Sequence, residues 1–502
     1  MKRQTTMRSI LTRGSMVTIL MLSLAGTSAA REGAVGVTLK EAIRSAAEKN
    51  LDVKAELYNP AMSEADVQNY RGIYDPLFAL DTNKLNYGES SSPGQSSIDK
   101  TKNFNFNTGI SRLMPWGGTV GLVFANGWAK TGATIPGFQN KLGVTIIQPL
   151  LKNFGQDTTE LKISVAQSDK DALLEQYRTK VTDIVSQVRT EYFKLYNLRE
   201  DLEVKKNSLE LARKVLDETR ARVKAGVLPA MEILSAEATV ATRESDVINA
   251  ERLMRDESDL LRTLLQLKGS ELIDPLDKPA ISALQLNEET SIWRALQLRP
   301  EMKQLRENLR SADLQERVAR HQVKPDLSLN ANAGLSGINQ LYGRQWESLA
   351  RGDYPVWSLG LTFNYPLGNS SAENDYLKYK LKAEQLRTQI RSKEEAITNE
   401  VRSSIRAVNS GYKQIEVTKR GSAYAEENLN AYIKKAAVGL ATTKDVFDVQ
   451  NNLVAAKGAE ITARTGYDAA LTQYWKSTSE LLDREGIKIT GQEADALYTK
   501  MR

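Results

Sequence analysis

The sequence predicts a mainly α-helical protein built from two similar halves, each with a short strand-forming region and a very long helical hairpin. Three observations support this prediction: apolar residues recur every seven positions over long stretches, short segments alternate polar and apolar residues, and both features occur twice in the same order. The chain has 502 residues, of which 41% are apolar and 26% charged, so it can bury a large core.

The N-terminus has the composition of a secretory signal peptide over residues 1–30. Four basic residues and no acid accompany an apolar run, Val17 to Leu24, and small residues end the segment at Ala30. The run is too short for a membrane-spanning helix. Cleavage after Ala30 would lower the formal net charge from +6 to +2. We therefore expect no nucleic-acid partner, because such binding needs a basic surface on the mature chain.

The composition also excludes several kinds of site. The chain has no Cys and one His, which argues against disulfides, thiolate metal sites, an N-terminal lipidated Cys and His-based catalysis. No nucleophile triad, phosphate-binding loop or metal-ligand motif occurs. We expect no catalytic residues, no cofactor and no metal. An enzyme using carboxylates is the weakest alternative, since no pair of acids converges on a cleft.

An internal repeat divides the chain into residues 38–270 and 287–486, followed by a C-terminal tail, 487–502. Pro76 aligns with Pro325 at an offset of 249 residues, whereas Gly226 aligns with Gly439 at an offset of 213. The first half therefore carries 36 extra residues before its long helix.

A seven-residue apolar spacing predicts coiled-coil hairpins at residues 156–268 and 373–486. The positions are Val181, Val188, Leu195, Leu202, Leu209, Leu216 and Val223 in the first half, and Val401, Val408, Ile415 and Leu429 in the second, with Ser422 as an interruption. As one helix, residues 156–225 would be about 105 Å long. A soluble coiled-coil rod would show the same periodicity.

Alternating segments predict strands within residues 74–150 and 325–366. In the second region, Trp357, Leu359, Leu361 and Phe363 alternate with polar or small residues. Such alternation, with aromatic residues near strand ends, is typical of a transmembrane β-barrel, and a soluble antiparallel sheet gives the same pattern. One chain offers four to six strands, and about eight is the smallest membrane barrel. A membrane barrel would therefore be shared between chains.

These features together resemble the TolC-like outer membrane efflux protein family. The matches are the duplicated arms, the strand-to-helix junctions at Pro149 and Pro366, and the turns at 223–228 and 436–441. The resemblance implies a homotrimer with a shared 12-stranded barrel in outer membrane lipid and a coiled-coil tunnel of helices in the periplasm. It also implies a periplasmic adaptor protein and an inner-membrane transporter as partners.

That resemblance implies a passive exit duct for a tripartite efflux pump or a type I secretion system, with a cargo that the sequence does not specify. The alternative is a periplasmic coiled-coil structural or adaptor-like protein. Fractionation separates the two, because the duct is an outer membrane oligomer and the alternative is soluble.

The hairpin turns are the first candidate site. Gly226 and Gly439 each follow a long helix, where a Gly suits a left-handed C-cap, and this structural role accounts for both. The resemblance adds that the tips dock on the adaptor. The predicted docking residues are Gly226, Val227, Leu228, Gly439, Leu440 and Ala441.

The second candidate site is an entrance gate. Asp445 and Asp448 lie on one face of a helix, which is either a solvated first turn or, by resemblance, part of a ring of six carboxylates in a trimer. Repulsion in such a ring would raise some of the pKa values and favour cations. The family's locking Tyr and Arg are replaced here by Ala436 and Ala441. We expect Glu232 and Lys444 to contribute to a rebuilt lock.

The 36 extra residues leave two possibilities, because residues 104–148 hold three alternating runs. They form either an additional hairpin in the barrel or a folded surface loop. The resemblance to a barrel of fixed strand number favours the loop.

Overall fold

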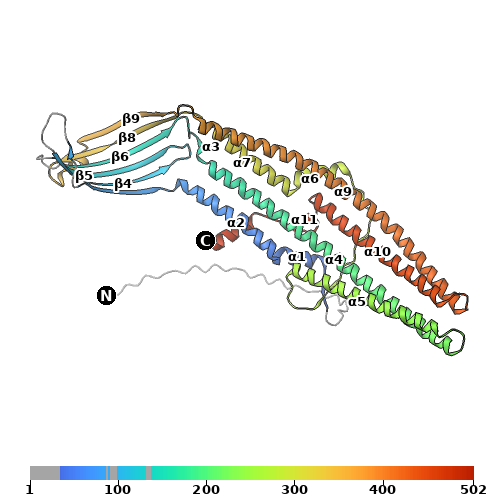
Figure 1. The fold of residues 1–502 in the computed structure, drawn as a ribbon. Helices are drawn as coiled ribbons and strands as arrows, with labels where there is room; N and C mark the ends of the chain where they lie inside the picture. Colours follow the sequence, from blue (N-terminus) through green and yellow to red (C-terminus); the bar gives the residue numbers. More distant parts are fainter. Residues whose placement is uncertain (1–33, 86–88, 91–98, 132–136) are drawn as a thin grey trace, which may run out of the picture.

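The computed structural model describes residues 34–85, 89–90, 99–131 and 137–502. The predicted signal peptide, residues 1–30, lies outside this range. The molecule is elongated, with a β-sheet at one end and the tips of two helical hairpins at the other (Figure 1). None of the helices in the described part of the chain is both long and apolar enough to cross a membrane.

The helices account for most of the length. In chain order they are α1 (Leu39–Lys49), α2 (Leu51–Arg71), the 3₁₀ helix η1 (Gly72–Tyr74), α3 (Gln156–Thr159), α4 (Leu161–Lys224), α5 (Met231–Leu265), α6 (Glu288–Leu298), α7 (Pro300–Gln322), α8 (Arg344–Arg351), α9 (Ser370–Ala437), α10 (Thr443–Ser477), α11 (Leu481–Arg484) and α12 (Gln492–Met501). The C-terminal segment thus contains a helix, α12, which packs on α2.

Helices α4 and α9 are the two long members, with 64 and 68 residues. At 1.5 Å per residue they are about 96 and 102 Å long. Next to the sheet, the contacts run α2–α4–α7–α9. The long helices α4 and α9 continue towards the tips. There α5 packs on α4, and α10 packs on both α4 and α9. Each half therefore has one long helix, a short partner near the sheet and a hairpin partner at the far end.

The predicted heptad positions form the helical core. Most of the α4 positions and all of the named α9 positions, including Ser422, are buried, while Leu209 and Val223 are half-buried. Each half also buries a tyrosine that anchors a segment outside the long helices. Tyr192 donates its hydroxyl to the carbonyl of Val37 at 2.8 Å, and Tyr467 donates to the carbonyl of Ser282 at 2.6 Å. The coiled-coil prediction is confirmed.

The strands form two sheets. They are β1 (Ala34–Val37), β2 (Leu77–Leu85), β3 (Glu89–Ser90), β4 (Asp99–Leu113), β5 (Thr119–Thr131), β6 (Gly137–Pro149), β7 (Leu272–Pro275), β8 (Asp326–Asn339) and β9 (Tyr354–Asn364). Strands β1 and β7 pair in parallel beside the helices. The large sheet has the order β2-β4-β5-β6-β8-β9, all antiparallel, with the short β3 paired to β4.

The expectation that the 36 extra residues form a surface loop is wrong. Strands β4 and β5 form a long hairpin inside the sheet, between β2 and β6. Its turn is tight because Gly117 adopts a φ of +87°, and Gly117 N–H donates to the carbonyl of Met114 at 2.9 Å. The alternation in these residues continues across 13 backbone-paired positions, so the segment completes a ladder that a loop would leave unpaired.

Candidate functional site

The large sheet has one apolar and one polar face. The pairing register places residues that are directly opposite one another on the same face. One face carries mainly apolar and aromatic side chains, among them Phe78, Leu80, Phe104, Phe106, Ile110, Leu122, Phe124, Leu142, Val144, Ile146, Leu329, Leu335, Trp357, Leu359, Leu361 and Phe363. The other carries mainly Asn, Ser, Thr, Gly and Ala, including Asn105, Asn107, Ser111, Thr145, Asn330, Asn332, Ser358 and Thr362.

Aromatic residues mark both borders of the apolar face. Phe104, Trp128 and Phe138 lie directly opposite one another across β4, β5 and β6, at the end far from the helices. At the helical end, Phe78 and Phe363 lie on the edge strands. Six residues separate Trp357 from Phe363, or about 20 Å along β9. An apolar band bordered by aromatic residues is typical of the lipid-facing side of a transmembrane β-barrel.

Helix α8 covers part of the apolar face at its far end. Trp346 stacks on Phe124 with ring centroids 5.4 Å apart, and Tyr342 contacts the edge of Phe138 at 5.3 Å. A side chain at Gly337 would clash with the carbonyl of Gln345, at 1.9 Å from the added Cβ. Asn140 lies directly opposite Gly337 on the same face. Helix α8 covers this position, and the side-chain amide of Asn140 is buried.

The two strand-to-helix junctions at Pro149 and Pro366 are built alike. Pro149 ends β6, Pro366 follows β9, and each precedes a turn with left-handed residues before the next helix. Hydrogen bonds join both turns to the end of α7. Asn369 Nδ2 donates to the carbonyl of Val323 at 2.8 Å, and Gln322 Nε2 donates to Asn153 Oδ1 at 2.6 Å. The two junctions therefore fix the position of the sheet relative to the helical layer.

The hairpin tips share one backbone motif. Gly226 N–H donates to the carbonyl of Val223 at 2.9 Å and Val227 N–H to that of Arg222 at 3.0 Å. Gly439 and Leu440 make the same two bonds, at 3.2 and 2.9 Å. Both glycines have a φ near +76°, and nothing lies within 4 Å of a Cβ added to either. The motif is a Schellman C-cap, so backbone conformation alone requires glycine there.

The tips also expose apolar side chains. Val227 is 70% exposed and Leu440 is 78% exposed, while Leu228 and Ala441 are half-buried. A bond that the sequence does not reveal joins the two hairpins, because Arg222 Nη1 donates to the carbonyl of Ala436 at 3.0 Å. Its acceptor is a backbone atom 214 residues away, so no side-chain pattern marks the pair.

Three of the predicted gate residues, Lys444, Asp445 and Asp448, lie at the start of α10 near the second tip, whereas Glu232 lies at the start of α5 near the first tip. Asp445 is the N3 partner in the capping box of α10: Thr442 N–H donates to Asp445 Oδ2 at 2.8 Å, and Asp445 N–H donates to Thr442 Oγ1 at 3.2 Å. Hydrogen bonds from Thr442 lower the pKa of Asp445, opposite to the direction expected for a ring. Asp448 and Lys444 are exposed, Glu232 is half-buried, and in the described residues neither Lys444 nor Glu232 forms an ion pair.

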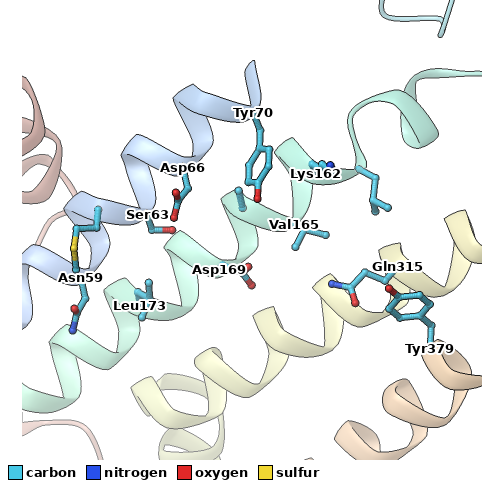
Figure 2. A pocket seen from close by; sticks show the side chains of 13 residues that line it. Asn59, Ser63, Asp66, Tyr70, Lys162, Val165, Asp169, Leu173, Gln315 and Tyr379 are labelled. Atoms are coloured by element: carbon cyan, nitrogen blue, oxygen red, sulfur yellow. The ribbon is translucent and has the colours of Figure 1, made fainter. Parts of the chain in front are cut away.

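A groove of about 710 Å³ opens in the helical layer below the sheet (Figure 2). Asp66 and Tyr70 from α2 line it, with Lys162 and Asp169 from α4 and Tyr379 from α9. Across the part of the chain that the structure describes, no group of three or more His, Cys, Asp or Glu is placed to hold a metal ion. The groove is a recess between helices with a mainly apolar lining and a few charged side chains, and the lining contains no histidine that could act as a base.

A buried ionic cluster lies between α4, α10 and α11. Arg189 bonds Glu485 at 2.7 Å and lies over the ring of Trp475, 4.6 Å from its centroid. Beside it, burial raises the pKa of Asp468 to about 7, although Arg189 and Arg464 oppose the shift. Sequence reasoning missed this cluster, because its members are distant in the chain and each is ordinary in its own helix.

Helical arms of this length joined to an amphipathic sheet define a class of membrane-inserted proteins with a long extramembrane extension. Comparisons with known proteins give the family. The chain is 26% identical over 386 residues to the outer membrane efflux protein BepC of Brucella suis biovar 1 (strain 1330), a match that covers 74% of this chain and 79% of BepC. It is 24% identical over 314 residues to the outer membrane protein TolC of Escherichia coli K12, covering 58% of this chain but only 60% of TolC.

Solved structures share the fold. The Campylobacter jejuni CmeC outer membrane channel superposes with a TM-score of 0.64 at 14% identity, covering 98% of both chains. A family model described as outer membrane efflux protein matches residues 135–266 and 292–475, one match in each half. The chain therefore belongs to the outer membrane efflux protein family, whose membership assigns it to the outer membrane.

Proposed function

We propose that this chain is the exit duct of a tripartite efflux pump or a type I secretion system, and that it conducts solutes passively. Three copies share one barrel in the outer membrane, and their helices form a tunnel through the periplasm. The amphipathic sheet carries this proposal. Its apolar face suits lipid, and its polar face suits a water-filled lumen on every long strand.

The helical tips are the proposed docking surface for a periplasmic adaptor that links the duct to an inner-membrane transporter. Val227 and Leu440 support this role, because apolar side chains at a solvent-facing turn favour burial against a partner. Asp445, Asp448, Glu232 and Lys444 are the proposed gate residues, with Asp448 the acid that its own helix leaves unbonded. The transporter, rather than the duct, would select the cargo.

Fractionation followed by electrical recording tests the duct. The expected result is a heat-resistant oligomer in the outer membrane fraction that produces discrete conductance steps in a planar bilayer. Recovery of the whole protein in the soluble periplasmic extract would contradict the proposal and favour a coiled-coil structural role.

Docking has its own test. The Val227→Asp and Leu440→Asp variants should lose cross-linking to the adaptor in cells and keep wild-type conductance in bilayers. The matched Val227→Leu and Leu440→Val variants should keep both. Loss of cross-linking in the conservative pair, or its retention in the Asp pair, would contradict docking through these side chains.

A further inference from the structure

Among the residues that the structure describes, the large sheet ends in two edge strands, β2 and β9, and each pairs on one side only. On the apolar face, Phe78 of β2 is 65% exposed and Leu361 of β9 is 68% exposed. Unpaired backbone groups at an edge are not tolerated in lipid, so each edge needs a partner strand. The sheet has six long antiparallel strands, and an even number makes β2 and β9 run in opposite directions. The β9 edge of one copy can thus continue the antiparallel ladder into the β2 edge of the next.

The helical layer has the same two edges. Helix α2 leads through η1 into β2, and β9 leads through the Pro366 junction into α9, so α2 and α9 lie at opposite borders of the layer (Figure 1). Near these borders Met62 of α2 is 59% exposed and Leu381 of α9 is 61% exposed. A second copy that pairs with the strand edge would also pack its α2 against α9. The fitting occupant of both edges is therefore another copy of this chain.

The widths of the two layers agree. Six strands spaced about 4.8 Å apart and tilted by about 40° cover about 37 Å of circumference. Four helices packed about 9 Å apart cover about 36 Å. Four strands at the same tilt would cover only about 25 Å. With the β4–β5 hairpin included, one copy covers the same arc in both layers.

That hairpin is fixed in the wall by specific contacts. Gly155 N–H donates to the carbonyl of Trp116 at 3.2 Å, and a Cβ added to Gly117 would lie 2.5 Å from the carbonyl oxygen of Asn153. Arg112 Nε also donates to the carbonyl of Tyr74 at 2.9 Å. The hairpin turn thus packs against the strand-to-helix junction that follows Pro149. Its two strands pair with β2 on one side and with β6 on the other.

We propose that three copies close through β9–β2 pairing into a barrel of 18 strands, widened by the β4–β5 hairpin. This inference rests on the trimer of the proposed function. The sheet radius would be about 18 Å, against about 12 Å for 12 strands at equal tilt, and the cross-section about 2.2 times larger. Small polar or apolar residues face the lumen from the hairpin, including Asn105, Asn107, Val123 and Ala125. The widened pore would admit bulky hydrophilic cargo.

Disulfide trapping tests the pairing, and the absence of Cys in the chain gives a clean background. Ala79→Cys of β2 is combined in turn with Ser358→Cys, Gly360→Cys and Thr362→Cys of β9, all on the polar face. We expect one combination to give covalent dimers and trimers, with the trimer as the largest product. The control Leu80→Cys, on the opposite face, should give none with the same partners. No product from any combination, or products larger than a trimer, would overturn the proposal.

Two conductance measurements test the strand count. Deletion of residues 99–131 removes β4 and β5 and should give a trimer with about half the wild-type conductance or less, by the ratio of cross-sections. If the deletion variant fails to fold, a bulky water-soluble thiol reagent decides. It should reduce the conductance of Asn107→Cys and leave Thr108→Cys, its neighbour on the other face, unchanged. Equal responses of the two Cys variants would overturn the 18-stranded barrel. Conductance of the wild-type protein would still support the proposed duct in that case, so the two failures can be distinguished.

Discussion

The Asp468→Asn substitution should stabilise the protein above neutral pH. Asp468 is 4% exposed, its Oδ2 lacks a hydrogen-bond partner, and burial raises its pKa from 3.8 to about 7. A carboxyl with a raised pKa in the folded state is stabilised by protonation. Its favourable contribution is therefore present at low pH and is lost as the pH rises from about 4 to about 7.

The size of the effect follows from that shift. One pKa unit corresponds to about 1.4 kcal/mol, so three units set an upper limit of about 4 kcal/mol per chain at pH 8. Because Arg189 and Arg464 lie close to the carboxylate, removing its charge also removes an attraction to them. We expect a net gain of about 2 kcal/mol, or roughly 2–4 °C in the melting temperature, for Asp468→Asn at pH 8.

Thermal unfolding of the detergent-solubilised protein between pH 5 and 8 is the assay. The wild-type melting temperature should fall with rising pH more steeply than that of Asp468→Asn, and the difference between the two should narrow towards pH 5. Asp375→Asn, which removes an exposed carboxylate of α9, is the control and should follow the wild type. A variant that is less stable than the wild type at pH 8 would refute the reasoning, because the ionised carboxylate would then contribute net attraction.

Three further predictions concern the second hairpin tip. Thr442→Ala removes the capping-box hydroxyl of α10 and should lower the free energy of unfolding by about 1 kcal/mol. An unchanged free energy of unfolding would contradict the stabilising role of this cap. Gly439→Ala should destabilise by about 1–2 kcal/mol in thermal melts, whereas Gly458→Ala, in the interior of α10, should stabilise by up to about 1 kcal/mol. Equal effects of the two would rule out the left-handed requirement. Asp448→Asn should reduce cation preference, measured as a reversal potential under a salt gradient, and an unchanged potential would remove Asp448 from the gate.

Local patterns predicted the features that local chemistry determines. The heptads of α4 and α9 fixed which residues are buried, and Gly226 and Gly439 marked the hairpin ends, because coiled-coil packing and C-capping depend on a few neighbouring residues. The loop interpretation of the β4–β5 region failed for a different reason. The residues themselves alternate, but the assumed fixed strand number outweighed that alternation.

Features that depend on long-range contacts were not predictable. Strands β1 and β7 have four residues each and are separated by more than 230 positions, so neither has a pattern long enough to recognise. The charge cluster of Arg189 and Asp468 appears only when α4 and α10 pack together. Asp445 illustrates a limit of a different kind, since one residue satisfies both a capping motif and a proposed gate, and its spacing does not separate the two roles.

Thiol labelling along β8 in intact cells tests most directly whether the two faces of the sheet meet water and lipid. Single cysteines replace Asn330, Ala331, Asn332 and Ala333 in the Cys-free chain, and a membrane-impermeant maleimide is added outside. Labelling should alternate, with strong reaction at 330 and 332 and little at 331 and 333, because the proposed barrel places the Asn positions in the lumen and the Ala positions in lipid. Equal labelling at all four positions, or the reverse alternation, would contradict a membrane-embedded sheet lining a water-filled duct.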